Sequence, residues 1–243
     1  MSYTIRSIKP CALKDIDFSV AERGVIGHVW PTSGTNRPLV EFRLLHDARN
    51  LYVNFCVSND HGVRIAHRGI QVPVHLDSCC EIFVRPKLGK GYFNFEMNAG
   101  GSLTLMYIED PSRTETGFNK YERLPAELCR TMEILHSMPE LAEKEIPGPT
   151  NWTLRYRVPF ALFEKYVGPL EAKETTWLGA LFSCAEETQQ PYWQSWTPIP
   201  SLNFHNVLVF RDLILEGTIA SEKTTSQIAT TSTIDLPDEC CRA

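Results

Sequence analysis

The chain has 243 residues, of which 43% are hydrophobic and 22% are charged, a balance typical of soluble globular proteins and not of disordered or fibrous ones. Lys and Arg number 24 against 29 Asp and Glu, and the resulting net charge of −5 leaves no basic excess for a phosphate backbone, so nucleic acid is not an expected partner. No apolar run reaches the length of a membrane-spanning helix, so no membrane partner is expected either.

Short runs that alternate apolar and polar residues dominate the chain and predict β-strands. Turn residues at 47–50 and 88–91 separate the first runs into pairs, which predicts two hairpins. The predicted strands cover residues 40–44, 51–57, 79–84, 92–98, 103–107, 152–158, 177–184 and 207–215. Because one-sided sheets must cover each other's apolar faces, this pattern predicts an all-β fold, an antiparallel β-sandwich of jelly-roll type with one or two short helices.

Elements other than strands are sparse. Proline residues interrupt the polar stretch 109–150, which predicts a long loop with one helical turn and a strand near 132–135. A proline at the start of residues 159–163 predicts a short helix there. Residues 218–243 hold nine Ser or Thr and no aromatic residue, which predicts a flexible tail after a single domain of residues 1–217.

Eight cysteines occur without metal-type spacing, and several lie within apolar runs. Cys56 and Cys184 are therefore expected to be small buried hydrophobic residues. Adjacent cysteines on a strand point to opposite faces, so the pairs at 79–80 and 240–241 are not expected to form disulfides. This favours a reduced protein, and the start of the chain lacks an apolar signal segment, so a cytoplasmic location is expected.

Polar side chains form a row on one face of the hairpin predicted at 79–98. Glu81 lies on its first strand, while Asn94, Glu96 and Asn98 share one face of its second strand. Amide and carboxylate groups together supply the donors and acceptors that sugar hydroxyls need. A solvated outer face of an antiparallel sheet explains the same pattern equally well.

Aromatic residues gather in the proline-bounded stretch 186–200, where Tyr192, Trp193 and Trp196 lie outside any predicted strand. Flat aromatic faces in such a segment are typical of a platform on which a ligand stacks. Alternatively, one indole closes the end of the sandwich, because large aromatic residues are mostly buried.

Motifs for catalysis or cofactors are few. Glu81 and Glu96 offer the carboxylate pair of a glycosidase, but this alternative ranks below binding because neither carboxylate is expected to be desolvated. No nucleophile elbow, nucleotide cradle or zinc motif occurs, so no cofactor is expected. Asp47 and Asp60 give a weak indication of a structural calcium site.

Three ordered blocks of the sequence resemble family 9 carbohydrate-binding modules over about residues 35–217. The blocks are AspSerCysCysGluIlePheVal at 77–84, TyrPheAsnPheGluMetAsnAlaGlyGly at 92–101, and SerTrpThrProIlePro at 195–200 followed by AsnPheHis at 203–205. The resemblance implies a β-sandwich, in agreement with the strand pattern. It also implies a non-catalytic domain that holds a sugar, in its best-known members a chain end clamped between two tryptophan faces.

The resemblance assigns sugar-binding roles to several positions of this chain. Trp196 corresponds to one clamping tryptophan, with Trp193 as its neighbour, and Glu81 corresponds to the acid of the first block. His75 lies nearest the position of the second aromatic residue and offers a smaller platform. The complete set of candidate site residues is His75, Glu81, Asn94, Glu96, Asn98, Tyr192, Trp193 and Trp196.

We therefore expect a protein that binds a mono- or oligosaccharide and serves glycan degradation or uptake. The alternatives are a glycoside hydrolase that uses Glu81 and Glu96, and an interaction module whose sugar site is degenerate. Members of the family are often secreted, so an extracytoplasmic location is the alternative to a cytoplasmic one.

Overall fold

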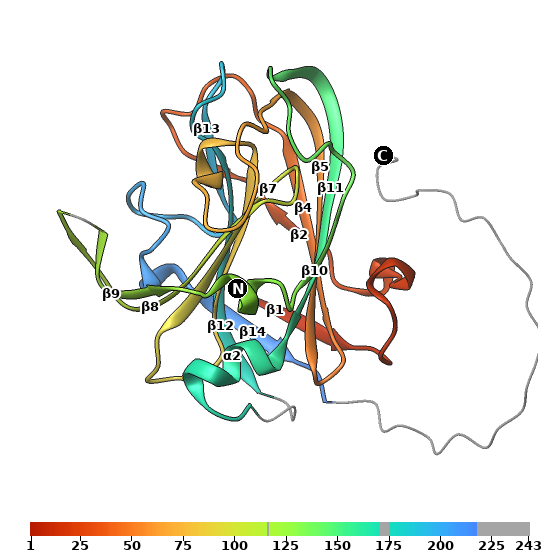
Figure 1. The fold of residues 1–243 in the computed structure, drawn as a ribbon, viewed down its shortest axis with the longest axis vertical. Helices are drawn as coiled ribbons and strands as arrows, with labels where there is room; N and C mark the ends of the chain where they lie inside the picture. Colours follow the sequence, from red (N-terminus) through yellow and green to blue (C-terminus); the bar gives the residue numbers. More distant parts are fainter. Residues whose placement is uncertain (116, 171–174, 218–243) are drawn as a thin grey trace, which may run out of the picture.

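Two β-sheets pack face to face in the computed structural model, which describes residues 1–115, 117–170 and 175–217 (Figure 1). The first sheet contains β2 (Gly24–Ile26), β4 (Leu39–His46), β5 (Asn50–Val63), β10 (Glu133–His136) and β11 (Ile146–Pro159). The second contains β3 (His28–Val29), β6 (Cys79–Arg85), β7 (Tyr92–Asn98), β8 (Leu103–Thr114), β9 (Gly117–Arg123), β12 (Thr176–Ala185), β13 (Tyr192–Ser195) and β14 (Arg211–Leu215). The predicted all-β sandwich is thus confirmed.

Strand β1 (Ser2–Ser7) connects the two sheets, because its first four residues pair with β14 and its last two residues pair with β4. Both of these pairings are parallel, whereas the other ladders between the described strands are antiparallel. The sandwich is therefore mixed and not purely antiparallel. Parallel pairing of this kind joins strands distant in sequence and has no signature in the local alternation.

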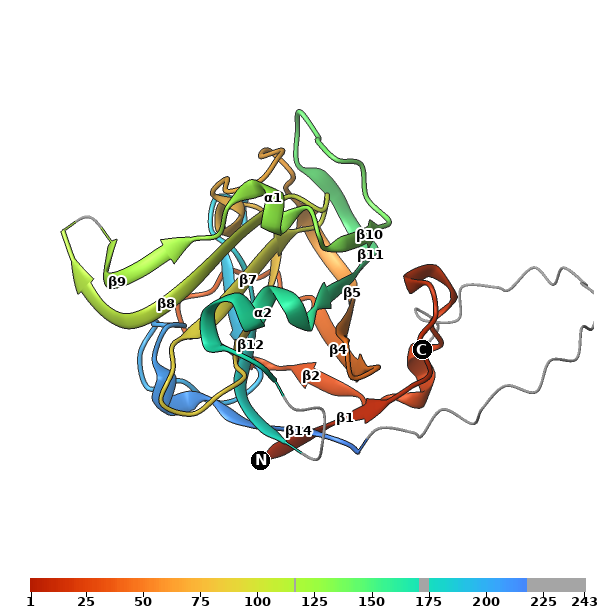
Figure 2. The ribbon, with the colours of Figure 1, turned by 60° about the horizontal axis from the view of Figure 1, so that its bottom comes forward.

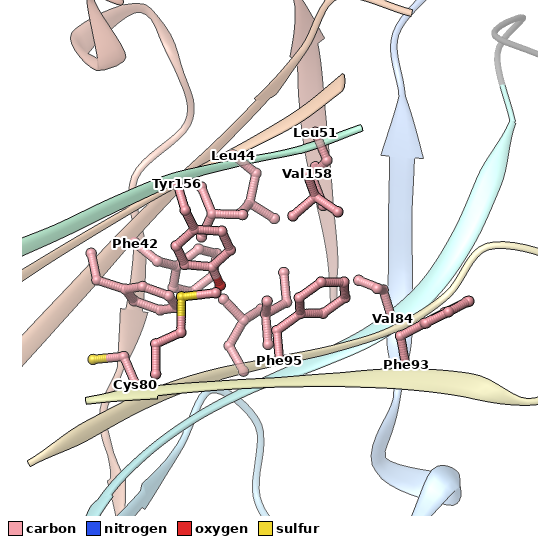
Figure 3. Packing of buried hydrophobic residues seen from close by; sticks show 14 of the residues in the cluster. Phe42, Leu44, Leu51, Cys80, Val84, Phe93, Phe95, Tyr156 and Val158 are labelled. Carbon is pink, nitrogen blue, oxygen red and sulfur yellow. The ribbon is translucent and has the colours of Figure 1, made fainter. Parts of the chain in front are cut away.

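Apolar side chains from the inward faces of both sheets form the main core (Figure 3). On β6 and β7, Cys80, Val84, Phe93 and Phe95 point toward the first sheet and are fully buried. Alternate residues of the same strands point to the opposite face of the sheet. The predicted assignment of alternate residues to opposite faces is confirmed, and the outward face also carries the buried apolar residues Phe83 and Tyr92.

Strands β8 and β9 extend beyond the sheet as a two-stranded arm (Figure 2). The expected loop over 109–150 is wrong for this part, because β8 continues to Thr114 and turns back into β9. Most side chains of β9 are exposed, so no buried face imposes an alternating pattern there. The expected helical turn and strand of this region are present as α1 (Ala126–Cys129) and β10.

The helices of the described residues are few and short. Helix α2 (Phe160–Val167) begins after Pro159, as predicted, and packs against the end of the sandwich. Four 3-10 turns complete the helical elements, at Leu13–Asp15, Phe18–Val20, Val74–Leu76 and Val207–Val209. The last turn replaces the first three residues of the strand predicted at 207–215, and β14 begins at Arg211. Neither α-helix of the described residues has the length and apolar character needed to span a membrane.

Cysteine placement follows the predicted pattern within the described part of the chain. Cys56 and Cys184 are buried, and the six cysteines described by the structure are free thiols. The predicted tail at 218–243, with its pair at 240–241, lies outside the described residues.

Candidate functional site

A cavity of about 770 Å³ lies on the outer face of the second sheet, beside the β8–β9 arm. Its lining comes from three parts of the chain that are far apart in sequence. Strands β6, β7 and β8 form its floor, the arm forms one wall, and the segments around His75, Trp193 and Phe204 form the other. The arm and these segments therefore cover the outward face of the β6–β7 hairpin, which is not simply exposed to solvent.

The floor of the cavity holds two carboxylates on neighbouring strands. Glu81 of β6 lies directly opposite Glu96 of β7, and the residues are 3% and 6% exposed. Burial raises the pKa of Glu96 to about 7. Burial, together with the charge of Glu96, also raises the pKa of Glu81. The expectation that neither carboxylate is desolvated is wrong, because the arm and the loops cover the polar row.

Asn94 supports this floor without lining the cavity. It is fully buried, and its Nδ2 donates a hydrogen bond of 2.6 Å to Glu96 Oε1. Its Oδ1 accepts a hydrogen bond of 2.9 Å from the backbone N–H of Met106 on β8. Asn94 therefore orients Glu96 and links β7 to β8 beneath the site.

Trp193 of β13 presents a half-buried indole to the cavity. Strand β13 pairs with β12, which places Trp193 opposite Cys184. The indole Nε1 donates a hydrogen bond of 3.1 Å to Glu186 Oε1, and the backbone N–H of Trp193 donates to Ser33 Oγ. These contacts fix the plane of the ring at the cavity wall.

Trp196 lies in the core and not at the cavity. It is 3% exposed, and its ring makes edge-to-face contacts with Phe42 and Tyr3 at centroid distances of 5.6 and 6.3 Å. The predicted stacking platform at Trp196 is therefore wrong, and its indole closes the sandwich instead. Tyr192 is also fully buried, because the stretch read as a loop contains a strand whose alternate residues point inward.

The residues of the predicted polar row have two different roles. Glu81 and Glu96 line the cavity, whereas Asn98 stabilises the turn after β7. Asn98 is fully buried, and its Nδ2 donates hydrogen bonds of 2.8 Å to Asp77 Oδ2 and 2.9 Å to the carbonyl of His67. Its Oδ1 accepts from the backbone of Gly100 and Ser102. The expected sugar contact at Asn98 is wrong, because these bonds occupy the amide in the turn after β7. Four of the eight candidate residues line the cavity together, namely His75, Glu81, Glu96 and Trp193.

Several cavity residues were not identified from the sequence. Arg113, Phe118, Tyr121 and Arg123 line the wall formed by the arm, and the Arg113 guanidinium lies 4.2 Å from the centroid of the Phe118 ring. Their only sequence signal is the occurrence of aromatic and Arg residues together in a polar segment. The arm returns over the sheet through a bulged β8–β9 ladder, which local sequence does not reveal.

The loop after β13 adds Phe204 and His205 to the lining. His205 packs against Phe118 and Phe83 at centroid distances of 4.4 and 4.8 Å, and it shares a hydrogen bond of 2.9 Å with the Tyr92 hydroxyl. Burial lowers the pKa of His205 to about 3, so the ring is neutral near pH 7. Both residues belong to the AsnPheHis block of the resemblance.

The suggested calcium ligands do not meet. Asp47 lies in the turn before β5, where it accepts hydrogen bonds from Arg49, Asn50 and Tyr52. Asp60 lies ten residues further along β5 than its first residue, so the two carboxylates are on the order of 30 Å apart. They do not form a common calcium site.

The cavity thus combines an aromatic plane, carboxylates, imidazoles and guanidinium groups. An aromatic plane suits the apolar C–H face of a sugar ring, and the charged groups suit its hydroxyls, since they donate or accept strong hydrogen bonds. This arrangement favours a polyhydroxylated ligand.

Comparison with known proteins agrees with this chemistry. The family model described as "Carbohydrate-binding family 9" matches residues 13–215 of the chain. Among curated proteins, none matches this chain.

Solved structures with the same fold include proteins from two bacteria. A candidate carbohydrate-binding protein from Bacteroides uniformis has 23% identity and a TM-score of 0.77, and the alignment covers 88% of this chain and 99% of that one. A family 9 carbohydrate-binding module from Caldicellulosiruptor kristjanssonii in complex with glucose has 11% identity and a TM-score of 0.61, with 92% and 100% covered. A structure of such a module from the same organism with cellotriose has 10% identity and a TM-score of 0.59, with 94% and 100% covered.

Proposed function

The chain belongs to carbohydrate-binding family 9, and on this premise we propose that its cavity binds a mono- or oligosaccharide without catalysis. The observation that carries the proposal is the convergence of Trp193, His75, Glu81 and Glu96 on one cavity. The Caldicellulosiruptor modules were solved with glucose and cellotriose, which makes these two sugars the first ligands to test.

Trp193 supplies the stacking plane in this proposal. Its indole is half-buried at the wall and held by Glu186, so little rotational freedom is lost when a ring stacks on it. Stacking of a flat ring on an aromatic side chain is worth about 1–3 kcal/mol. The stacking role expected for Trp196 is thus assigned to Trp193 instead.

In this proposal, side chains of the cavity floor and of the β8–β9 arm bind the hydroxyl groups of the sugar. With the pKa of Glu96 near 7, the Glu81–Glu96 pair holds a proton over part of the neutral range, so it can both donate to and accept from a sugar hydroxyl. His75 lies at the rim, with Nδ1 4.0 Å from Glu96 Oε2. Arg113 and Arg123 add donors from the opposite side of the cavity. We propose that this binding serves the degradation or uptake of glycans.

Calorimetric titration of the full chain with glucose, cellotriose and a panel of soluble glycans tests the proposal. We expect Trp193→Ala to weaken binding roughly tenfold or more, in line with the loss of about 1.4 kcal/mol or more. Trp30→Ala is the matched control, because Trp30 is also half-buried but does not line the cavity. Equal affinity of wild type and Trp193→Ala would remove this indole from the site.

Two other outcomes discriminate the alternatives. A folded wild-type protein that binds none of the glycans would indicate a module whose sugar site is degenerate. Release of reducing sugar by wild type, abolished in Glu81→Gln while binding persists, would indicate a hydrolase that uses the opposed carboxylates. The second outcome has a physical basis, since both carboxylates are desolvated as general acids require.

A further inference from the structure

Two thiols lie beside the Glu81 carboxylate, and the proposed sugar site does not use them. Cys79 of β6 is directly opposite Cys184 of β12, and Glu81 lies two residues further along the same face of β6. The Sγ atoms of both cysteines and a carboxylate oxygen of Glu81 all lie within 4.8 Å of one another. All three residues are at most 3% exposed.

These separations match the edges of a tetrahedral metal site. Zinc lies about 2.3 Å from thiolate sulfur and about 2.0–2.2 Å from carboxylate oxygen, so tetrahedral angles place sulfur and oxygen ligands about 3.5 Å apart. In the structure, Cys184 Sγ is 3.2 Å from Glu81 Oε1. The other two separations are at most 4.8 Å, so shifts of up to about one ångström would let these atoms surround an ion.

The carboxylate of Glu81 lacks a strong partner. Among the described residues, the Cys184 thiol is the one hydrogen-bond donor to it. An S–H group is a weak donor, and a buried carboxylate without strong donors is costly. A cation held by the same three side chains would stabilise the ionised form of Glu81, which burial alone disfavours, and would give both thiols a function.

The surroundings suit thiolate ligands. Cys79 and Cys184 pack in an apolar cluster with Val74, and the side chains of Trp193 and Phe204 cover the cluster. Such a shell limits access of water on the side of the two thiols, while Glu81 lines the cavity floor, the side from which a water ligand would enter. The three ligands come from two adjacent strands of the sheet, so their positions are rigid.

We propose that Cys79, Cys184 and Glu81 bind one divalent cation of the zinc class, with a water molecule in the fourth position. Two soft thiolates and one carboxylate favour zinc over calcium or magnesium, which prefer oxygen ligands alone. Binding converts both thiols to thiolates and Glu81 to its carboxylate, and the protons of these groups are released to solvent. Although Glu81 also lines the cavity, this inference does not depend on sugar binding, because the geometry of the cluster supports it whatever the cavity holds.

Titration of the metal-free full chain with Co²⁺ and then Zn²⁺, under a non-thiol reductant, tests the site. Cys240→Ser/Cys241→Ser serves as the background, so that the adjacent thiols outside the described residues do not compete. We expect one Co²⁺ per chain with a thiolate-to-cobalt charge-transfer band, and displacement of that Co²⁺ by Zn²⁺. We expect Cys79→Ala and Cys184→Ala to lose the band and at least about a hundredfold in zinc affinity, since even supporting residues change it by about 10–100-fold.

Cys80→Ala is the matched control, because Cys80 adjoins Cys79 but faces the core between the sheets. It is expected to retain the band. Absence of the band in the background protein, its persistence in Cys79→Ala, or an equal loss in Cys80→Ala would overturn the proposal. If an alanine variant loses its near-ultraviolet circular dichroism, X-ray absorption of the zinc-loaded background protein decides instead. Two sulfur neighbours support the site, and a shell of oxygen and nitrogen alone refutes it.

Discussion

The two faces of the β6–β7 hairpin are both buried, yet they differ in what covers them. The inward face carries Cys80, Val84, Phe93 and Phe95, which pack against the first sheet. The outward face carries Glu81 and Glu96 beneath the arm and the loops. Apolar groups are satisfied by contact alone, whereas buried polar groups need specific partners. The carboxylates of the outward face have few such partners, which supports our proposal that a ligand binds on that face.

Substitution of Trp196 and of Trp193 gives the largest expected effect and tests whether the inward face is a core and the outward face a binding site. Trp196→Ala removes a core indole and is expected to lower the free energy of unfolding by about 3–5 kcal/mol. Trp193→Ala, at the half-buried wall, is expected to cost far less stability while it weakens sugar binding. Urea denaturation monitored by circular dichroism measures both. Equal destabilisation by the two substitutions would show that the outward face is a second core and not a site.

Substitution of Asn98 tests whether this residue of the outward face serves stability and not sugar binding. Asn98→Ala removes four hydrogen bonds in the turn after β7 and leaves Asp77 with one donor fewer. We expect a loss of about 2–3 kcal/mol in stability, since a buried polar group without its partner costs about 1–3 kcal/mol. Sugar affinity of the folded fraction is expected to stay unchanged. A large loss of affinity in calorimetry, with stability intact, would return Asn98 to the binding site.

The pH dependence of stability tests the packing of His205. Its pKa is about 3 in the folded protein, below its ordinary value of 6.5, because the ring is buried. The unfolded chain therefore takes up a proton between pH 6.5 and 3 that the folded protein does not, so stability falls as pH decreases through this range. Between pH 7 and pH 5.5, this difference in proton uptake lowers the free energy of unfolding by about 1 kcal/mol.

His205→Gln is expected to remove this part of the pH dependence and to leave a flatter curve of denaturation midpoint against pH. The glutamine is also uncharged over the range and retains an amide near the Tyr92 hydroxyl. Superimposable pH curves for the two proteins would show that the His205 ring takes up its proton in the folded state as well.

The arm supplies the smallest expected effect. Arg113 lies over the Phe118 ring and contributes to the cavity wall without a place in the core. Arg113→Gln is expected to change stability by less than about 0.5 kcal/mol, as surface substitutions do. It is expected to weaken oligosaccharide binding about threefold, a loss of one hydrogen bond or less. Unchanged titrations with cellotriose would show that the arm does not contact the sugar.

Much of the fold and half of the candidate site follow from local sequence. Period-two alternation predicts the sandwich strands, and it assigns Glu81 and Glu96 correctly to the face opposite the core. The choice between Trp193 and Trp196 does not follow, because it depends on the pairing of β13 with β12. The arm is missed because a strand exposed on both sides has no alternation to detect.

The order of residues in this chain decides which side chains share a face, because the pleat of a strand imposes that division locally. It does not decide what lies over each face. The desolvation of Glu81 and Glu96 requires the arm and the segments around Trp193 and Phe204 to fold over the same strands. The meeting of Cys79 with Cys184 requires the pairing of two strands that are distant in sequence. Burial and long-range pairing are properties of the assembled sandwich, so the chemistry of the cavity emerges only when its walls are in place.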